Sequence, residues 1–225
     1  VLTLVLATGV WRMAKRNALV KKLQAVEALG EAQVIAVDKT GTITKNEMVI
    51  REVFVDGKHF EIGGTGYEPR GDVRLAGNVV DPPNHPELLL AGKIAALCTD
   101  GRAVFSEETQ MWRTTGDHTE VAMFVFAEKL AFHKDDLEQE SPLIAEIPFD
   151  YETKYHITAH ESEGKELVTV VGAPEVILQA SRDIWSAGRE QTLTKGKREE
   201  LEKVFQKMSE RGLRVIGFSY ALRPL

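Results

Sequence analysis

Residues 34–42 read VIAVDKTGT, so an apolar run leads directly to Asp38, and Thr40, Gly41 and Thr42 follow it. A carboxylate can act as a nucleophile and accept a phosphoryl group as an aspartyl-phosphate. That reaction needs a divalent cation and hydrogen-bond donors around the phosphoryl oxygens. Threonine hydroxyls and backbone N–H groups beside a glycine can supply those donors. Taken alone, the motif is equally consistent with a strand that ends at a helix-capping Asp.

Three side chains further along the chain could contact a nucleotide: Glu120, Phe149 and Lys154. An aromatic ring can stack on a base, and a lysine five positions later can bring a cation near the same site. Each residue also has an ordinary structural interpretation. Phe149 could be a core residue, Lys154 a solvated lysine, and Glu120 a carboxylate favoured by a helix N-terminus. The six histidines, His118 among them, show no metal-ligand spacing and are interpreted as surface or core residues.

The elements that must position these residues alternate between helix and strand. A helix is expected over 1–29, ending at Gly30, and a buried strand over 32–38. Asp56-Gly57 between two apolar runs predicts a hairpin over 48–62. The Gly- and Pro-rich stretch 63–86 predicts a loop with one short strand near 72–77. Further helices are expected over 85–98, 117–132, 173–181 and 197–212, and further strands over 144–150, 155–161, 165–172 and 213–222.

Composition excludes several classes of protein. The chain has 225 residues and a formal net charge of −6, which implies no general affinity for nucleic acid. The single cysteine, Cys98, cannot form an intrachain disulfide and fits a reducing environment. The apolar run 1–11 is shorter than the roughly twenty residues that cross a bilayer. Basic residues between 12 and 22 follow it, as at the cytoplasmic end of a transmembrane helix. The alternative is an amphipathic helix packed on a soluble core.

Several motifs together resemble one family. VDKTGTITKNEM (37–48) is similar to the phosphorylation motif of the P-type cation-transporting ATPases, and most similar to the type II branch of calcium and sodium/potassium pumps. Five later segments resemble that branch in the family's order, the first four its nucleotide-binding domain and the fifth the strand that returns to the phosphorylation domain. They are GTGYEP (64–69), TGDHTEVAM (115–123), IPFDYETKYHIT (147–158), VVGAPEVIL (170–178) and RGLRVIGFSY (211–220). Ordered matches along nearly the whole chain are more specific than any single motif.

The resemblance implies a role for each site residue. Asp38 would be the phosphorylated nucleophile and, with the backbone carbonyl of Thr40, a Mg²⁺ ligand. Lys39, Gly41 and Thr42 would complete the catalytic loop. ATP would be bound by five residues: Glu120, Phe149, Lys154, Gly172 and Arg214. Val171 stands where the family has a lysine, so Val171→Lys is expected to tighten MgATP binding.

The resemblance also implies an α/β fold in four segments. Residues 1–29 would be the end of a transmembrane helix and the cytoplasmic stalk. Residues 30–50 would begin a Rossmann-like phosphorylation domain of the haloacid-dehalogenase type. Residues 51–216 would form an α+β nucleotide-binding domain, an antiparallel sheet flanked by helices. Residues 217–225 would be a strand that returns to the phosphorylation domain.

The implied function is that of part of an ATP-driven, multi-pass membrane pump whose residues here are mostly cytoplasmic. Its partners would be ATP, Mg²⁺, membrane lipid and a transported cation, for which Ca²⁺ is one option that the residues do not fix. The fragment alone is expected to be inactive. Two other classes stay open: a stand-alone nucleotide-binding module without catalysis, and a soluble phosphatase with an aspartate nucleophile.

Overall fold

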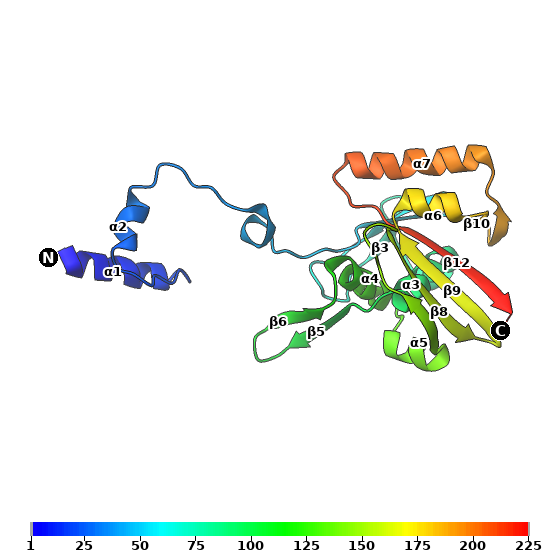
Figure 1. The fold of residues 1–225 in the computed structure, drawn as a ribbon, viewed down its shortest axis with the longest axis horizontal. Helices are drawn as coiled ribbons and strands as arrows, with labels where there is room; N and C mark the ends of the chain where they lie inside the picture. Colours follow the sequence, from blue (N-terminus) through cyan, green and yellow to red (C-terminus); the bar gives the residue numbers. More distant parts are fainter. Residues whose placement is uncertain (1, 225) are drawn as a thin grey trace. The chain divides into compact units, whose positions relative to one another are not determined.

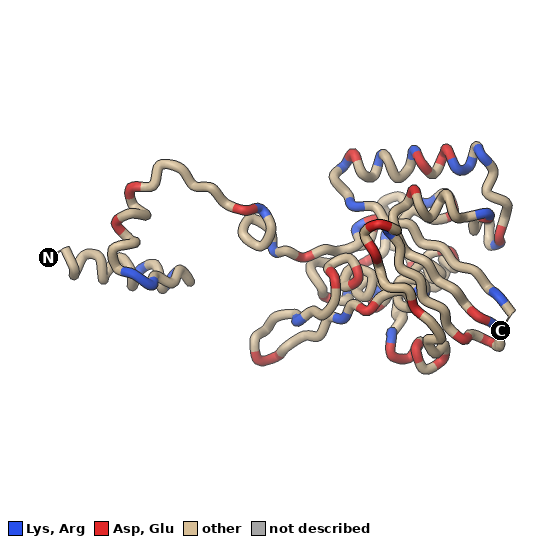
Figure 2. The backbone as a smooth tube through the Cα atoms, viewed as in Figure 1, with Lys and Arg blue, Asp and Glu red and all other residues tan. Residues whose placement is uncertain are grey.

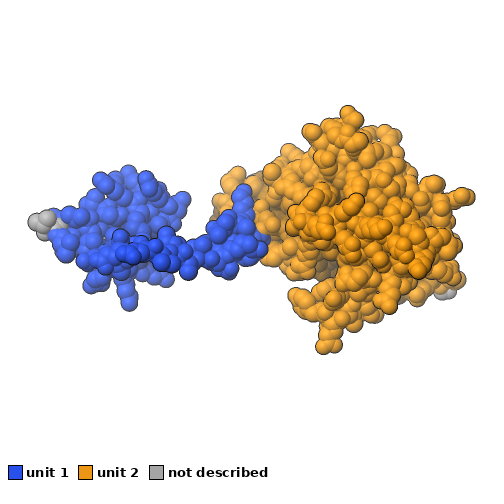
Figure 3. Space-filling view, turned by 90° about the horizontal axis from the view of Figure 1, so that it is seen from above, with its two compact units in different colours: residues 1–46 blue, residues 47–225 orange. Residues whose placement is uncertain are grey.

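The computed structural model describes residues 2–224 and divides the chain into two compact units, residues 1–46 and 47–225 (Figure 3). Residues 1 and 225 are the outermost positions of the first and last predicted segments, and they lie outside the described residues.

The first unit contains two short helices instead of the single helix predicted over 1–29. They are α1 (Leu2–Ala14) and α2 (Ala25–Gly30). Helix α1 ends because Asn17 adopts a left-handed conformation, with φ of 61°, which asparagine tolerates better than most residues. The N–H of Ala18 then donates to the carbonyl of Met13 at 3.0 Å, which is the hydrogen bond of a Schellman motif. The prediction of one continuous helix was therefore wrong.

The strand predicted over 32–38 is also absent from the structure. These residues belong to no sheet, and their apolar side chains are exposed, Ile35 by 81%. A buried parallel strand exists only where neighbouring strands pair with it on its edges. None of the strands described between residues 2 and 224 pairs with this segment, so its apolar pattern alone does not make a strand.

The second unit contains every described strand, and all of their pairings are antiparallel. One sheet has the order β1-β2-β3-β4 and another the order β12-β9-β8-β7, and β5-β6 and β10-β11 are separate hairpins. The strands are β1 (Glu52–Val55), β2 (Lys58–Ile62), β3 (Val73–Leu75), β4 (Asn78–Val80), β5 (Arg102–Ser106), β6 (Met111–Thr115), β7 (Leu143–Ile147), β8 (Tyr155–Ser162), β9 (Lys165–Gly172), β10 (Asp183–Ser186), β11 (Arg189–Thr192) and β12 (Gly217–Pro224).

The helices of this unit lie on both faces of the sheet β12-β9-β8-β7 (Figure 1). The helices are α3 (Pro86–Leu97), α4 (His118–Lys129), α5 (Lys134–Glu140), α6 (Pro174–Ala180) and α7 (Lys195–Glu210). Helices α3 and α4 pack together on one face, and α6 packs on the other face below α7. The main core is centred on α3 and also includes buried residues of α4, β2, β3 and β9. The prediction of an antiparallel sheet flanked by helices is thus confirmed.

Strand β12 is paired with β9 along its whole length, from Gly217 opposite Gly172 to Pro224 opposite Lys165. It is an edge strand of this sheet. Residues 217–225 are predicted to be a strand that returns to the phosphorylation domain. The strand itself is present over Gly217–Pro224, and its place in another domain stays a prediction.

Candidate functional site

The predicted phosphorylation motif forms a tight turn in the first unit. The turn η1 (Lys39–Ile43) is closed by the N–H of Thr44, which donates to the carbonyl of Lys39 at 3.1 Å. Gly41 sits at its apex with φ of 74°, a conformation that favours glycine. Asp38 immediately precedes the turn, is exposed, and its carboxylate accepts no hydrogen bond from the turn's own N–H groups. The carboxylate is therefore accessible, and a tight turn that contains Thr40 and Thr42 follows it.

The predicted nucleotide residues all lie in the second unit, and one of them opens helix α4. Asp117 caps the helix by accepting a hydrogen bond from Thr119 N at 2.8 Å, and Glu120 Oε2 accepts from Asp117 N at 3.3 Å. This reciprocal arrangement is a capping box. The capping box holds the Glu120 backbone and one of its carboxylate oxygens in place. Glu120 therefore has the structural role of a carboxylate at a helix N-terminus.

Opposing effects set the charges at this helix end. Burial disfavours the charged form of Asp117, but hydrogen bonds from Thr119 and the nearby charge of Arg214 outweigh it, so the pKa of Asp117 is lowered. Burial also raises the pKa of Glu120, and the carboxylates of Asp100 and Asp117 add to this rise. Arg214 itself is exposed, in the segment between α7 and β12. Arg214 and the start of α4 are thus electrostatically coupled.

Phe149 and Lys154 flank a turn between β7 and β8. The Asp150 carboxylate accepts hydrogen bonds from the N–H groups of Glu152 at 2.9 Å and Thr153 at 3.0 Å, an Asx-turn arrangement. The Phe149 ring is 42% exposed and makes an edge-on contact with Tyr151, with ring centroids 5.3 Å apart. Phe149 is therefore a half-exposed residue on a turn held by hydrogen bonds, and it is not a core residue.

The backbone of Lys154 is fixed by two hydrogen bonds. Its N–H donates to the Asp150 carbonyl at 2.7 Å, and its own carbonyl accepts from Ala173 N at 2.9 Å. Its ammonium lies 3.5 Å from the Glu175 carboxylate, and both side chains are more than half exposed. An exposed pair of this kind is weak, so Lys154 can exchange this partner for a ligand.

Gly172 is required where β9 passes the start of β8. A Cβ at this position would lie 2.4 Å from the carbonyl oxygen of Lys154 and 2.9 Å from the Cα of Tyr155. Only glycine permits that approach of two backbones. The role of Gly172 is therefore to let Lys154 sit close to the end of β9.

Two further residues of this region, His156 and Glu146, were not predicted as site residues. His156 lies on the face of β8 that packs against α3 and α4, and its side chain is 4% exposed. Its Nε2 lies 2.8 Å from Glu146 Oε1, and its Nδ1 lies 3.7 Å from Glu120 Oε1. The sequence offers no signal for this cluster, because Glu120 is far from the other two residues along the chain.

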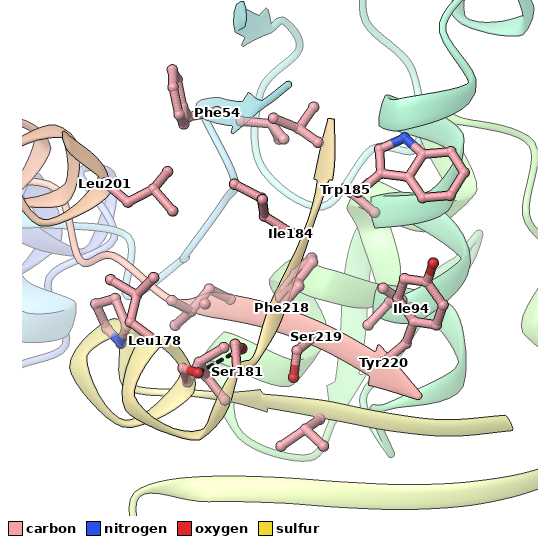
Figure 4. A pocket seen from close by; sticks show the side chains of 18 of the residues that line it. Phe54, Ile94, Leu178, Ser181, Ile184, Trp185, Leu201, Phe218, Ser219 and Tyr220 are labelled. Carbon is pink, nitrogen blue, oxygen red and sulfur yellow. Dashed lines mark hydrogen bonds between the residues drawn. The ribbon is translucent and has the colours of Figure 1, made fainter. Parts of the chain in front are cut away.

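A large apolar groove lies elsewhere in the second unit. It has a volume of about 1120 Å³ and lies between β1, β10, β12, α6 and α7. Leu178, Ile184, Leu201 and Phe218 are among its lining residues (Figure 4). Lys, Arg and Glu residues occur along the whole length of α7 (Figure 2). Of the predicted nucleotide residues, Arg214 lines this groove, whereas the others do not.

Two other kinds of feature are absent from residues 2–224. Over that range no helix is both long and apolar enough to cross a bilayer. Nor do the described side chains include three or more His, Cys, Asp or Glu residues arranged to hold a metal ion.

Comparison with known proteins gives a consistent family. A family model for the P-type ATPase cytoplasmic domain N matches residues 88–223. The cation-transporting ATPase pma1 of Synechocystis sp. is 38% identical over 228 residues, which cover 97% of this chain and 24% of that protein. The calcium-transporting ATPase of Bacillus subtilis is 33% identical over 226 residues, 100% of this chain and 25% of the relative. Human calcium-transporting ATPase type 2C member 1 is 36% identical over 224 residues, which cover 97% of this chain and 24% of that protein.

The chain therefore belongs to the P-type ATPases, and its residues 88–223 correspond to their cytoplasmic domain N. The family predicted from the ordered motifs is confirmed. The chain spans about a quarter of the length of the curated relatives that it matches.

Proposed function

We propose that this chain is the part of an ATP-driven cation pump that binds ATP and accepts its γ-phosphate on Asp38. The proposal rests on two features found in one chain. An exposed aspartate precedes a Gly-containing turn, and a domain that matches the P-type ATPase cytoplasmic domain N follows it. The names of the relatives, cation-transporting and calcium-transporting ATPases, support transport of a cation. They do not fix which cation this protein moves.

In this proposal ATP is bound by the second unit. The ring of Phe149 stacks on the adenine, for which base–aromatic stacking supplies about 1–3 kcal/mol. Lys154 provides a cation, and Gly172 allows its backbone to sit close to the sheet. Glu120 and Arg214 complete the binding residues, Glu120 at the start of α4 and Arg214 beside Asp117.

Asp38 would hold Mg²⁺ through a carboxylate oxygen and Thr40 through its backbone carbonyl. Oxygen donors of this kind suit Mg²⁺, and the Asp38 carboxylate is exposed and not used to cap its own turn. When bound, the ion would neutralise negative charge on the transferring phosphoryl group. Lys39, Gly41 and Thr42 would orient the loop around the phosphoryl oxygens. The start of a Rossmann-like phosphorylation domain in residues 30–50 is part of this proposal.

The proposal is tested by acyl-phosphate formation in the whole protein that contains this chain. Protein incubated with γ-labelled ATP and quenched in acid should carry a label that hydroxylamine releases. Asp38→Asn should carry none, while Asp56→Asn, a hairpin-turn aspartate of the second unit, should be labelled normally. Full labelling of Asp38→Asn would refute the assignment. If the whole protein binds MgATP but is never labelled, it is a nucleotide-binding module.

A further inference from the structure

Three side chains form a row beside the predicted nucleotide site: Glu146, His156 and Glu120. They come from three different elements, β7, β8 and the first turn of α4. The imidazole of His156 stands between the two carboxylates, with Nε2 2.8 Å from Glu146 and Nδ1 3.7 Å from Glu120. A buried histidine between two acids is not needed for packing alone, because an apolar side chain of similar volume would fill the same space.

The two ring nitrogens differ in their hydrogen bonding. The 2.8 Å contact between His156 Nε2 and Glu146 is a hydrogen bond. When the imidazole is neutral, its Nε2–H donates to the Glu146 carboxylate. Nδ1 is buried and has no hydrogen-bond partner, because 3.7 Å is too long for one. In the neutral ring, Nδ1 then carries no hydrogen, and its lone pair faces the carboxylate of Glu120. Two acceptors face one another and no proton stands between them.

Two carboxylates lie beside the imidazole, and other polar groups line the rest of its surroundings. The carboxylates beside the imidazole are those of Glu120 on α4 and Glu146 on β7, and Asp100 and Asp117 act in turn on Glu120. On β9, the residue opposite His156 is the uncharged Val171. Cys98 Sγ contacts the His156 carbonyl, and burial raises the pKa of this thiol to about 11, so it is neutral. Among the cationic groups of this region, Lys154 and Arg214 are exposed, whereas Lys134 of α5 is buried and acts on the Cys98 thiol.

We propose that His156 is a positioning residue of the ATP site, and that MgATP binding is accompanied by uptake of one proton at Nδ1, which then donates to Glu120. The proton comes from solvent and binds the Nδ1 lone pair, so no other bond is broken. The added negative charge of MgATP favours the protonated ring, and the new hydrogen bond fixes Glu120 at the start of α4. This inference rests on the proposed function, because it assumes that ATP binds beside Glu120.

Linkage fixes the direction of the pH effect. Because the bound state holds the proton more tightly, MgATP affinity is highest at low pH within the range where histidine titrates. It then falls as pH rises, by at most tenfold per pH unit for one proton. A purely structural role for His156 would change stability but leave this slope unaltered.

The test is calorimetric titration of the 225-residue chain with MgATP, at about pH 7, in buffers of different ionisation enthalpy. The wild type should take up a fraction of a proton more than His156→Gln, which keeps an N–H donor for Glu146 but cannot titrate. This difference cancels any ionisation of the nucleotide. His133→Gln is the matched control, since His133 is an exposed histidine 2.8 Å from Glu128, and it should behave as the wild type.

A second measurement does not depend on any variant being folded. In ¹⁵N-histidine-labelled wild type, saturating MgATP should move one Nδ1 from the unprotonated to the protonated shift range. Binding with equal proton uptake in wild type and His156→Gln, or with unchanged histidine shifts, would overturn the inference and leave the proposed function standing. A folded wild-type chain that does not bind MgATP would overturn both.

Discussion

The carbonyl oxygen of Lys154 lies 2.4 Å from the position that a Cβ on Gly172 would occupy. The end of β9 and the turn that carries Phe149 therefore approach closely, and they are joined by the hydrogen bond from Ala173 N–H to the same Lys154 carbonyl. The sheet and the predicted nucleotide residues are therefore coupled through one glycine. A change at Gly172 should affect both stability and ligand binding.

Gly172→Ala should lower the free energy of unfolding by about 1–3 kcal/mol, because backbone atoms must move to admit the methyl group. The displaced Lys154 should also weaken MgATP binding. Urea unfolding and MgATP titration measure the two effects. Gly196→Ala is the control: its Cβ would meet nothing within 4 Å and its φ is not left-handed, so no loss is expected. Wild-type stability in Gly172→Ala would show that the two backbones are not in close contact.

Much of the second unit follows from local sequence. The hairpin at Asp56-Gly57 and the helices α3, α4, α6 and α7 were predicted because turn residues and helical periodicity are local signals. The hairpins β5-β6 and β10-β11 were missed. The hairpin β5-β6 has its turn at Gln110, a non-glycine residue with φ of 52°, and the hairpin β10-β11 has its turn at Ala187-Gly188. Neither turn has a sequence that strongly predicts a hairpin.

The site could be predicted only in part. Residues within a recognisable motif, such as Phe149 and Glu120, were named from the sequence, and their binding roles stay predictions. His156 was interpreted as an ordinary histidine, since its relation to Glu120 arises only when β8 packs against α4. The strand predicted over 32–38 failed for a related reason: an apolar run specifies a strand only when partners pair with it.

Phe149→Ala should weaken MgATP binding by about 1–3 kcal/mol, or roughly five- to 150-fold in Kd, through loss of base stacking. Stability should change little because the ring is half-exposed. Phe105→Ala is a matched control: this ring is also 42% exposed and contacts Trp112 with centroids 5.3 Å apart, but it lies on the hairpin β5-β6. Equal losses of affinity in both variants would mean that the effect is not specific to stacking.

Asp117→Ala should lower the free energy of unfolding by about 1 kcal/mol at neutral pH, through loss of the helix cap. The pKa of Asp117 is lowered in the folded state, so its contribution is fully present above the ordinary value near pH 4. It is lost as pH falls through the lower folded pKa. The difference between variant and wild type should therefore shrink in acid, as thermal unfolding at a series of pH values can show.

The control for that series is Asp135→Ala, an exposed carboxylate in the first turn of α5 that pairs with Arg102 at 3.3 Å. It should change stability by less than about 0.5 kcal/mol. A difference for Asp117→Ala that stays constant down to the lowest pH would contradict the ionised cap.

Val171→Lys tests whether β9 borders the bound nucleotide. Val171 lies opposite His156 in the register of β8 and β9 and is 4% exposed. A lysine there should lower stability by about 1–3 kcal/mol, since a polar group enters a core position. It should tighten MgATP binding by roughly fivefold, from an added charge interaction of about 1 kcal/mol. Val168→Lys places the same change on the opposite face of β9, towards the groove, and should reduce stability without changing Kd. If Kd is unchanged in a folded Val171→Lys protein, position 171 does not face the nucleotide, and the family's lysine acts elsewhere.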